Sequence, residues 1–139
     1  MRNRILAAVI VTALGTASPV MAQGKLTTSK EPTSSGRPLS QWIADLKALA
    51  PQTRNAAAYE IAGMGPEAAA AVPALIEALD DSSPVVRFPV TVALGEIGPA
   101  AKAAVPRLQQ MADEEINDEI AASARRALRH IQAPAATTQ

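Results

Sequence analysis

The sequence predicts an all-α fold, a short α-solenoid of about six antiparallel helices. One phrase occurs twice, as GPEAAAAVPAL at residues 65–75 and as GPAAKAAVPRL at residues 98–108, and eight of the eleven positions are identical. The offset of 33 residues is typical of stacked helical repeats, which bury their apolar faces against one another. The composition agrees with this fold, because 48% of the residues are hydrophobic, many of them are alanine, and alanine has the highest helix propensity.

Length and charge narrow the class of protein. A chain of 139 residues forms at most one domain of ordinary size. Thirteen basic residues balance thirteen acidic ones, so the sequence predicts no general attraction to nucleic acid. Cysteine is absent, which excludes disulfides, thiolate metal sites and a cysteine nucleophile.

Residues 1–22 are predicted to be a secretory signal peptide. Arg2 and Arg4 precede an apolar run at residues 5–17, and small residues lead up to Ala22, after which cleavage is expected. An apolar run of about thirteen residues falls short of the roughly twenty that span a bilayer, so we expect no stable membrane span once the leader is cleaved. The mature protein is therefore predicted to be exported, either periplasmic or secreted.

The repeat domain is predicted at residues 38–132. A flexible linker is expected before it, at residues 23–37, because Thr, Ser, Lys, Gly and Pro predominate there and bury little apolar surface. A disordered tail is expected after it, at residues 133–139.

The single tryptophan marks a predicted core position in the half repeat that opens the domain. Counting 33 and 66 residues onward from Trp42 reaches Leu75 and Leu108. A position that is large and apolar in every copy is expected to be buried, so we predict that Trp42 packs in the core rather than binding a ring-shaped ligand.

Proline and glycine mark the expected ends of the first helix in each repeat. Pro51 and Pro84 lie one period apart and suit the first helical position, where a missing N–H is not needed. Gly65 and Gly98 suit the other end, where the chain leaves the helix in a left-handed conformation. Pro89 falls inside the second of these helices, which predicts a kink or a late start there.

The segment VVRFPVTVALGEIGPAAKAAVPRL at residues 85–108, with its weaker copy TRNAAAYEIAGMGPEAAAAVPAL at residues 53–75, resembles the HEAT repeat family. It is most similar to the bacterial variety that is grouped with phycobilisome-lyase-type repeats. The resemblance implies helix pairs stacked into a right-handed superhelix, in which the second helix of each pair lines the concave face.

The resemblance also implies a structural polar ladder. In such repeats, an acidic residue after the second helix commonly pairs with an arginine that opens the next first helix. Asp80 and Arg87 match this pattern, and Arg54 matches the arginine alone. The last helix departs from it, because Ala121 stands where its arginine is expected.

The sequence offers no catalytic residues, no metal site and no cofactor site. His130 is the only histidine, and a metal site needs three or four converging ligands. The acidic residues between 113 and 119 lack the glycine turn of a calcium loop. We therefore expect a protein that is not an enzyme.

The concave face is the remaining candidate site. The residues expected to point outward from the second helices include Gln41, Glu77, Arg107 and Gln110. Their mixed charge favours a protein or peptide partner, so the sequence predicts an exported scaffold that binds one. The alternative, suggested by the resemblance alone, is a bilin-lyase-like or other enzyme-accessory HEAT protein.

Overall fold

The computed structural model of the protein describes residues 30–134. The predicted signal peptide, residues 23–29 of the predicted linker and residues 135–139 of the predicted tail lie outside the described residues. The part described below belongs to one compact unit that begins at Glu31.

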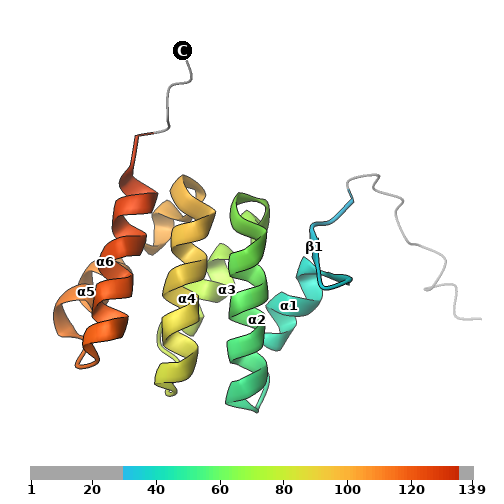
Figure 1. Cartoon of the computed structure of the whole chain (residues 1–139), viewed down its shortest axis with the longest axis horizontal. Coiled ribbons are helices and arrows are strands. Elements are labelled where there is room, and N and C mark those ends of the chain that lie inside the picture. Colours follow the sequence, from blue (N-terminus) through green and yellow to red (C-terminus); the bar gives the residue numbers. More distant parts are fainter. Residues whose placement is uncertain (1–29, 135–139) are drawn as a thin grey trace, which may run out of the picture. The chain divides into compact units, whose positions relative to one another are not determined.

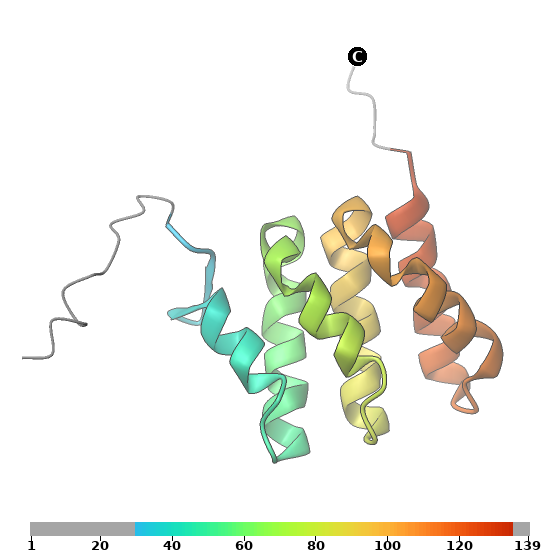
Figure 2. The same ribbon diagram turned by 180° about the vertical axis from the view of Figure 1, so that it is seen from behind.

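Six α-helices are present in the described part, and they lie in two rows. The row of first helices contains α2, α4 and α6, which lie side by side (Figure 1). The row of second helices lies behind it and contains α1, α3 and α5 (Figure 2). The predicted all-α stack is thereby confirmed. The bounds are α1 Leu39–Asp45, α2 Pro51–Met64, α3 Val72–Ala78, α4 Pro84–Ile97, α5 Val105–Glu114 and α6 Asp118–Gln132.

The phrase that occurs twice in the sequence forms the corner between the two rows. A 3-10 helix, η2 at Gly65–Ala71 and η3 at Gly98–Ala104, leads from the first helix of each repeat into the second. Gly65 has φ 58° and ψ −136°, and Gly98 has φ 74° and ψ −140°. The predicted positive φ is confirmed. The ψ values, however, place both residues outside the left-handed helical region, in a region that glycine alone adopts readily.

The core runs through the whole stack at the predicted stride. Trp42, Leu75 and Leu108 are 8%, 0% and 0% exposed, so they occupy matching buried positions in successive layers. The prediction that Trp42 is a core residue is confirmed.

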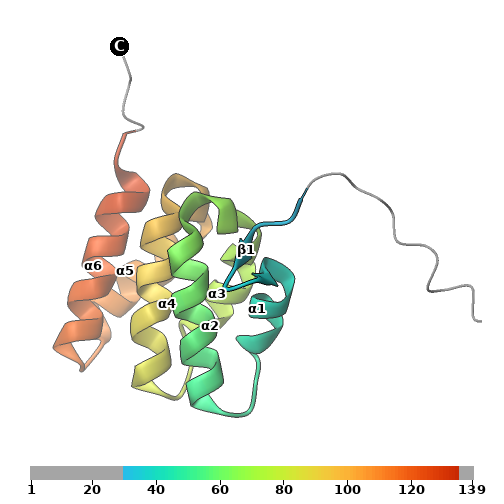
Figure 3. The ribbon, with the colours of Figure 1, turned by 45° about the vertical axis from the view of Figure 1, so that its right-hand side comes forward.

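The chain before α1 is an ordered β-hairpin, although residues 23–37 were expected to be a flexible linker. Strands β1 (Thr33–Ser34) and β2 (Arg37–Pro38) pair antiparallel, with Thr33 opposite Pro38. The hairpin lies against α1 and α2 (Figure 3).

Contacts to the helices explain why such a polar segment is ordered. The indole Nε1 of Trp42 donates to the carbonyl of Ser34 at 3.2 Å, and the Arg37 guanidinium lies 3.9 Å from the centre of the Trp42 ring. The hydroxyls of Ser34 and Ser35 donate to the Glu60 carboxylate of α2 at 2.6 and 2.9 Å. Glu60 lies 26 residues from Ser34, and Trp42 lies 8 residues from it on the following helix, so the composition of the segment itself does not reveal these contacts.

Helix α4 continues without interruption through Pro89, so the predicted late start is wrong. It begins at Pro84 and ends at Ile97. Because proline has no N–H, the carbonyl of Val85, four residues earlier, loses its usual helical partner. The side-chain amide of Asn55, on α2, donates to that carbonyl at 2.5 Å instead. A neighbouring helix thus supplies the hydrogen bond that the proline removes.

Candidate partner-binding surfaces

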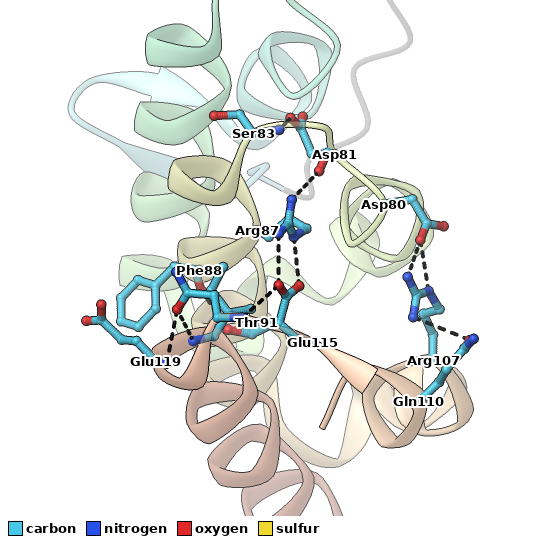
Figure 4. A network of polar contacts seen from close by, with 12 residues as sticks. Asp80, Asp81, Ser83, Arg87, Phe88, Thr91, Arg107, Gln110, Glu115 and Glu119 are labelled. Atoms are coloured by element: carbon cyan, nitrogen blue, oxygen red, sulfur yellow. Dashed lines mark hydrogen bonds and ion pairs between the residues drawn. The ribbon is translucent and has the colours of Figure 1, made fainter. Parts of the chain in front are cut away.

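A polar ladder joins the loops along one edge of the stack, but its acidic members differ from the predicted one. Arg54 pairs with Asp81 at 2.6 and 2.9 Å. Arg87 pairs with Glu115 through two hydrogen bonds of 3.0 Å and also donates to the backbone carbonyl of Asp81 at 2.9 Å (Figure 4). The prediction that Asp80 pairs with Arg87 is wrong, because Asp80 lies apart from Arg87 and faces Arg107 (Figure 4).

The geometry of the loop after α3 explains this correction. The Asp81 carboxylate also accepts a hydrogen bond from the backbone N–H of Ser83 at 2.9 Å, which holds it over the start of α4. Asp80 is left on the exposed side of the same loop. In α6, where alanine replaces the expected arginine, Arg125 lies one turn later and donates to the carbonyl of Ala112 in α5.

The ladder is a structural feature, because its side chains are largely buried and satisfied. The exposed fractions of the side chains are 14% for Arg54, 8% for Asp81, 17% for Arg87 and 12% for Glu115. The hydrogen bond from Arg54 lowers the pKa of Asp81, against the opposite effect of burial. The hydrogen bond from Arg87 lowers the pKa of Glu115 in the same way.

Two of the four predicted binding residues lie together on α5. Arg107 Nε donates to the Asp80 carboxylate at 2.9 Å, and Arg107 Nη1 donates to Gln110 Oε1 at 3.4 Å. Gln110 in turn donates to Glu114 at 2.8 Å. Asp80 is the acidic partner of Arg107 in this group, although the sequence analysis assigned Asp80 to the buried ladder.

Glu77 lies on α3 beside a shallow hollow between α1 and α3. Its carboxylate pairs with Lys47 at 2.9 Å, and both side chains are 66% exposed. The hollow has a volume of about 240 Å³, and Leu46, Ala74 and Ala78 contribute its apolar lining. Lys47, Glu77, Asp80 and Asp81 contribute its charges.

Gln41, the fourth predicted residue, does not line this hollow. It lies on α1 and accepts a hydrogen bond from Arg37 Nε at 3.1 Å, next to the hairpin. The structure therefore brings Glu77, Arg107 and Gln110 onto neighbouring helices, linked through Asp80, and places Gln41 apart from the hollow.

A second hollow, on the row of first helices, was not predicted from the sequence. It has a volume of about 330 Å³ and lies where α2, α4 and the start of α6 meet. Tyr59 and Phe88, the single tyrosine and the single phenylalanine of the chain, both line it. Tyr59 is 49% exposed and Phe88 is partly buried. We call it the aromatic hollow; its other lining residues are Asn55, Pro84, Val85, Asn117, Glu119 and Ile120.

One signal in the sequence pointed to this second surface. Phe88 corresponds to Asn55 at the 33-residue offset, and Tyr59 corresponds to Val92. The position of Phe88 is polar in the other copy and so is not a repeated core position, which makes Phe88 a candidate for the surface; the apolar counterpart of Tyr59 gives no such signal.

The comparison with known families agrees with this architecture. Residues 39–129, more than half of the chain, match the family of HEAT repeats. The chain belongs to the HEAT-repeat family. HEAT repeats commonly act as protein-interaction scaffolds, and the match does not distinguish the phycobilisome-lyase-type variety from others. No curated protein matches the sequence.

A third hollow lies near the end of the HEAT domain. It has a volume of about 530 Å³ and is lined by residues of η3, of the start of α5 and of the end of α6, among them Lys102, Val105 and Ile131.

Within residues 30–134, no group of three or more His, Asp or Glu side chains is placed to hold a metal ion. None of the helices in the described part of the HEAT protein has the length and apolarity needed to cross a membrane.

Proposed function

We propose that this HEAT-repeat protein is an exported, non-enzymatic scaffold that binds a protein or peptide along the row formed by α1, α3 and α5. The observation that carries the proposal is a line of exposed ion pairs that joins the layers of this row. Lys47 on the α1 side pairs with Glu77 on α3, and Asp80 pairs with Arg107 on α5. The hollow between α1 and α3 provides apolar surface beside these charges.

Exposed ion pairs of this kind suit an exchangeable binding surface. Each contributes only about 0–1 kcal/mol to folding, so a partner can replace one member at little cost in stability. Their side chains are already positioned on helices, which reduces the entropy lost on binding. The buried ladder of Arg54 and Arg87 lacks this freedom.

The distribution of charge favours a protein partner over a polyanion. The hollow carries the three carboxylates of Glu77, Asp80 and Asp81 and the single ammonium group of Lys47. Each of these carboxylates is paired with a cation, Asp81 with Arg54, Asp80 with Arg107 and Glu77 with Lys47, so the surface lacks the excess of cations that a nucleic-acid backbone attracts. A partner with charges of both signs can meet Glu77 and Arg107 in turn.

Export is supported by the first 22 residues of the sequence, which carry a basic start, an apolar run and small residues before the expected cleavage site. The absence of enzymatic activity is supported by a chain with one histidine and no cysteine. Fractionation of cells that produce the full chain tests export directly, since the mature protein should be found outside the cytoplasm without residues 1–22.

Charge reversal on the proposed surface tests the binding function. The doubly substituted protein Glu77→Lys, Arg107→Glu should lose the partner that the unaltered protein captures from the exported fraction, since the charge offered at each position is reversed and each ion pair becomes a pair of like charges. Circular dichroism should show unchanged helix content, because these pairs contribute little to stability.

Glu67→Lys, Lys102→Glu is the matched control, since it also exchanges one acid and one base without changing net charge. Both residues are exposed on the corners η2 and η3, away from the hollow. Retention of the partner by the control and its loss from the Glu77, Arg107 variant would support the proposal. Equal retention by both variants would contradict it.

A further inference from the structure

We propose that the aromatic hollow binds an arginine side chain of a partner protein. This site lies on α2, α4 and α6 and is separate from the charged row of α1, α3 and α5. Three features that recognise a guanidinium group meet there: the Tyr59 ring, the Phe88 ring and the Glu119 carboxylate.

The two rings come from neighbouring helices. Tyr59 lies on α2 and Phe88 on α4, and α2 and α4 pack directly against each other. The face of an aromatic ring attracts a cation that lies within about 6 Å of its centre. A flat guanidinium group can also stack on such a face, which an ammonium group cannot do.

Glu119 supplies an available negative charge at the start of α6. Asn117 caps this helix by accepting hydrogen bonds from the N–H groups of Glu119 and Ile120 at 3.0 and 3.2 Å. The cap fixes the first turn, and the Glu119 side chain lies beside the Phe88 ring (Figure 4).

Within the described part, the Glu119 carboxylate has no partner. Glu67, Glu96, Asp113 and Asp118 likewise have none, but Glu119 alone among them lines the aromatic hollow. Glu60 is held by two serine hydroxyls, and Asp81 and Glu115 are held by ladder arginines. The Glu119 carboxylate forms neither an ion pair nor a hydrogen bond with any residue between 30 and 134. It can therefore accept two N–H groups from one edge of a guanidinium group, whose face stays available to the rings.

The remaining walls suit the apolar stem of an arginine. Pro84, Val85 and Ile120 line the same hollow, and Val85 is 57% exposed. The three methylene groups of arginine can cover this surface while the guanidinium group reaches Glu119 and the rings. An uncharged apolar side chain would leave the Glu119 charge without a partner.

Arg126 is a nearby cation of the chain itself that partly offsets the negative charge of Glu119. Phe88 and Glu119 also border an adjoining hollow of about 220 Å³, which Arg126 lines from two turns further along α6. No ion pair joins Arg126 to Glu119 in the described residues, so this cation acts on the site only at longer range. Removing its charge should strengthen binding of an external cation.

Nuclear magnetic resonance can observe the site directly, because the chain has one tyrosine and one phenylalanine. We expect N-acetyl-arginine amide to shift the ring resonances of Tyr59 and Phe88 in a saturable manner. N-acetyl-citrulline amide is the matched neutral probe and should bind at least about tenfold more weakly, since it cannot form a charged hydrogen bond to Glu119. Added salt should weaken the arginine probe alone.

Comparing substitutions at two acidic residues of the same helical turn, Glu119 and Asp118, distinguishes binding in the hollow from a general effect of negative charge. Glu119→Gln should weaken binding of the arginine probe about tenfold. Asp118→Asn removes the same charge from the neighbouring position, which does not line the hollow, and should change binding less than about twofold. Arg126→Gln should strengthen binding.

Three results would overturn the proposal. They are equal binding of the arginine and citrulline probes, equal effects of Glu119→Gln and Asp118→Asn, and no shift of either ring at any probe concentration. None of them bears on the charged row of second helices, whose test uses Glu77 and Arg107.

Discussion

A single hydrogen bond allows α4 to contain a proline. Pro89 leaves the carbonyl of Val85 without its helical donor, and the side-chain amide of Asn55 donates to that carbonyl from α2. The equivalent of Pro89 in the previous repeat is Ala56, so the need for this bond arises in one copy alone. Asn55, on α2, therefore replaces the backbone donor that α4 lacks at Pro89.

Asn55 and Pro89 should be energetically coupled. Asn55→Ala should lower the free energy of unfolding by about 1 kcal/mol, because a hydrogen bond of average strength is lost. In a Pro89→Ala background the same substitution should cost much less, since the new N–H of residue 89 can serve the Val85 carbonyl. Urea unfolding of the four proteins measures the coupling, and strictly additive effects would contradict this account.

At the scale of elements, a glycine makes possible the close approach of α4 and α6. A Cβ atom added to Gly95 of α4 would lie 3.1 Å from the Cα and 3.3 Å from the Cβ of Ala127 in α6. The hydroxyls of Thr91 and Ser123 are 2.6 Å apart at the same interface. Helices α4 and α6 thus pack through small side chains, and this separation leaves no room for a methyl group.

Two Gly→Ala substitutions should consequently have opposite signs. Gly63, in α2, has no atom within 4 Å of an added Cβ, so Gly63→Ala should raise the free energy of unfolding by about 0.5–1 kcal/mol through helix propensity. Gly95→Ala gains the same propensity but pushes against the backbone of α6, and overpacking costs about 1–3 kcal/mol, so we expect net destabilisation. Thermal unfolding compares them, and equal stabilisation by both would contradict the close packing of α4 and α6.

The elements that the sequence predicts well are those fixed by backbone requirements. Positive φ at Gly65 and Gly98 and a proline at the first helical position recur at the same offset, because every repeat turns in the same way. The hairpin at residues 33–38 could not be predicted in this way. Its order depends on Trp42, which is on the next helix, and on Glu60, which is 26 residues from Ser34, while its own residues are typical of a linker.

The sequence does not show which of two adjacent aspartates, Asp80 or Asp81, belongs to the buried ladder. Asp80 and Asp81 are adjacent, and with one inserted residue both have acidic counterparts, Glu114 and Glu115. Periodicity alone cannot choose between two acids that both repeat. The aromatic hollow was missed for a different reason, since it requires α2, α4 and α6 to meet and no single helix contains it.

At the scale of the whole molecule, the buried carboxylates make stability depend on pH. Hydrogen bonds from Arg54, Arg87 and the serines of the hairpin lower the pKa values of Asp81, Glu115 and Glu60. A carboxyl group whose pKa is lower in the folded state favours folding at a pH above its unfolded pKa, which is about 4. These contributions are lost as the pH falls through the lower folded-state values.

We therefore expect the Tm to be nearly constant from neutral pH down to about 5 and to fall as the pH decreases below about 4. Glu115→Gln should make this fall less steep, because one of the responsible carboxylates is removed. Circular dichroism melts between pH 7 and pH 2.5 measure both slopes. A Tm that rises on acidification would show that the carboxylates do not stabilise the fold.

The polar ladder is compatible with the insertion of additional repeats. Arg54 and Arg87 each reach back to a backbone carbonyl before their helix and forward to an acid after the next helix. The forward connection of Arg54 falls within residues 51–83, and its backward connection reaches Ala48 in the preceding segment. A duplicate of residues 51–83 placed between Ser83 and Pro84 would therefore meet an equivalent carbonyl at Asp81. Gene duplication can thus lengthen this protein one unit at a time, and each added unit extends both rows of helices without any change to the residues that join them.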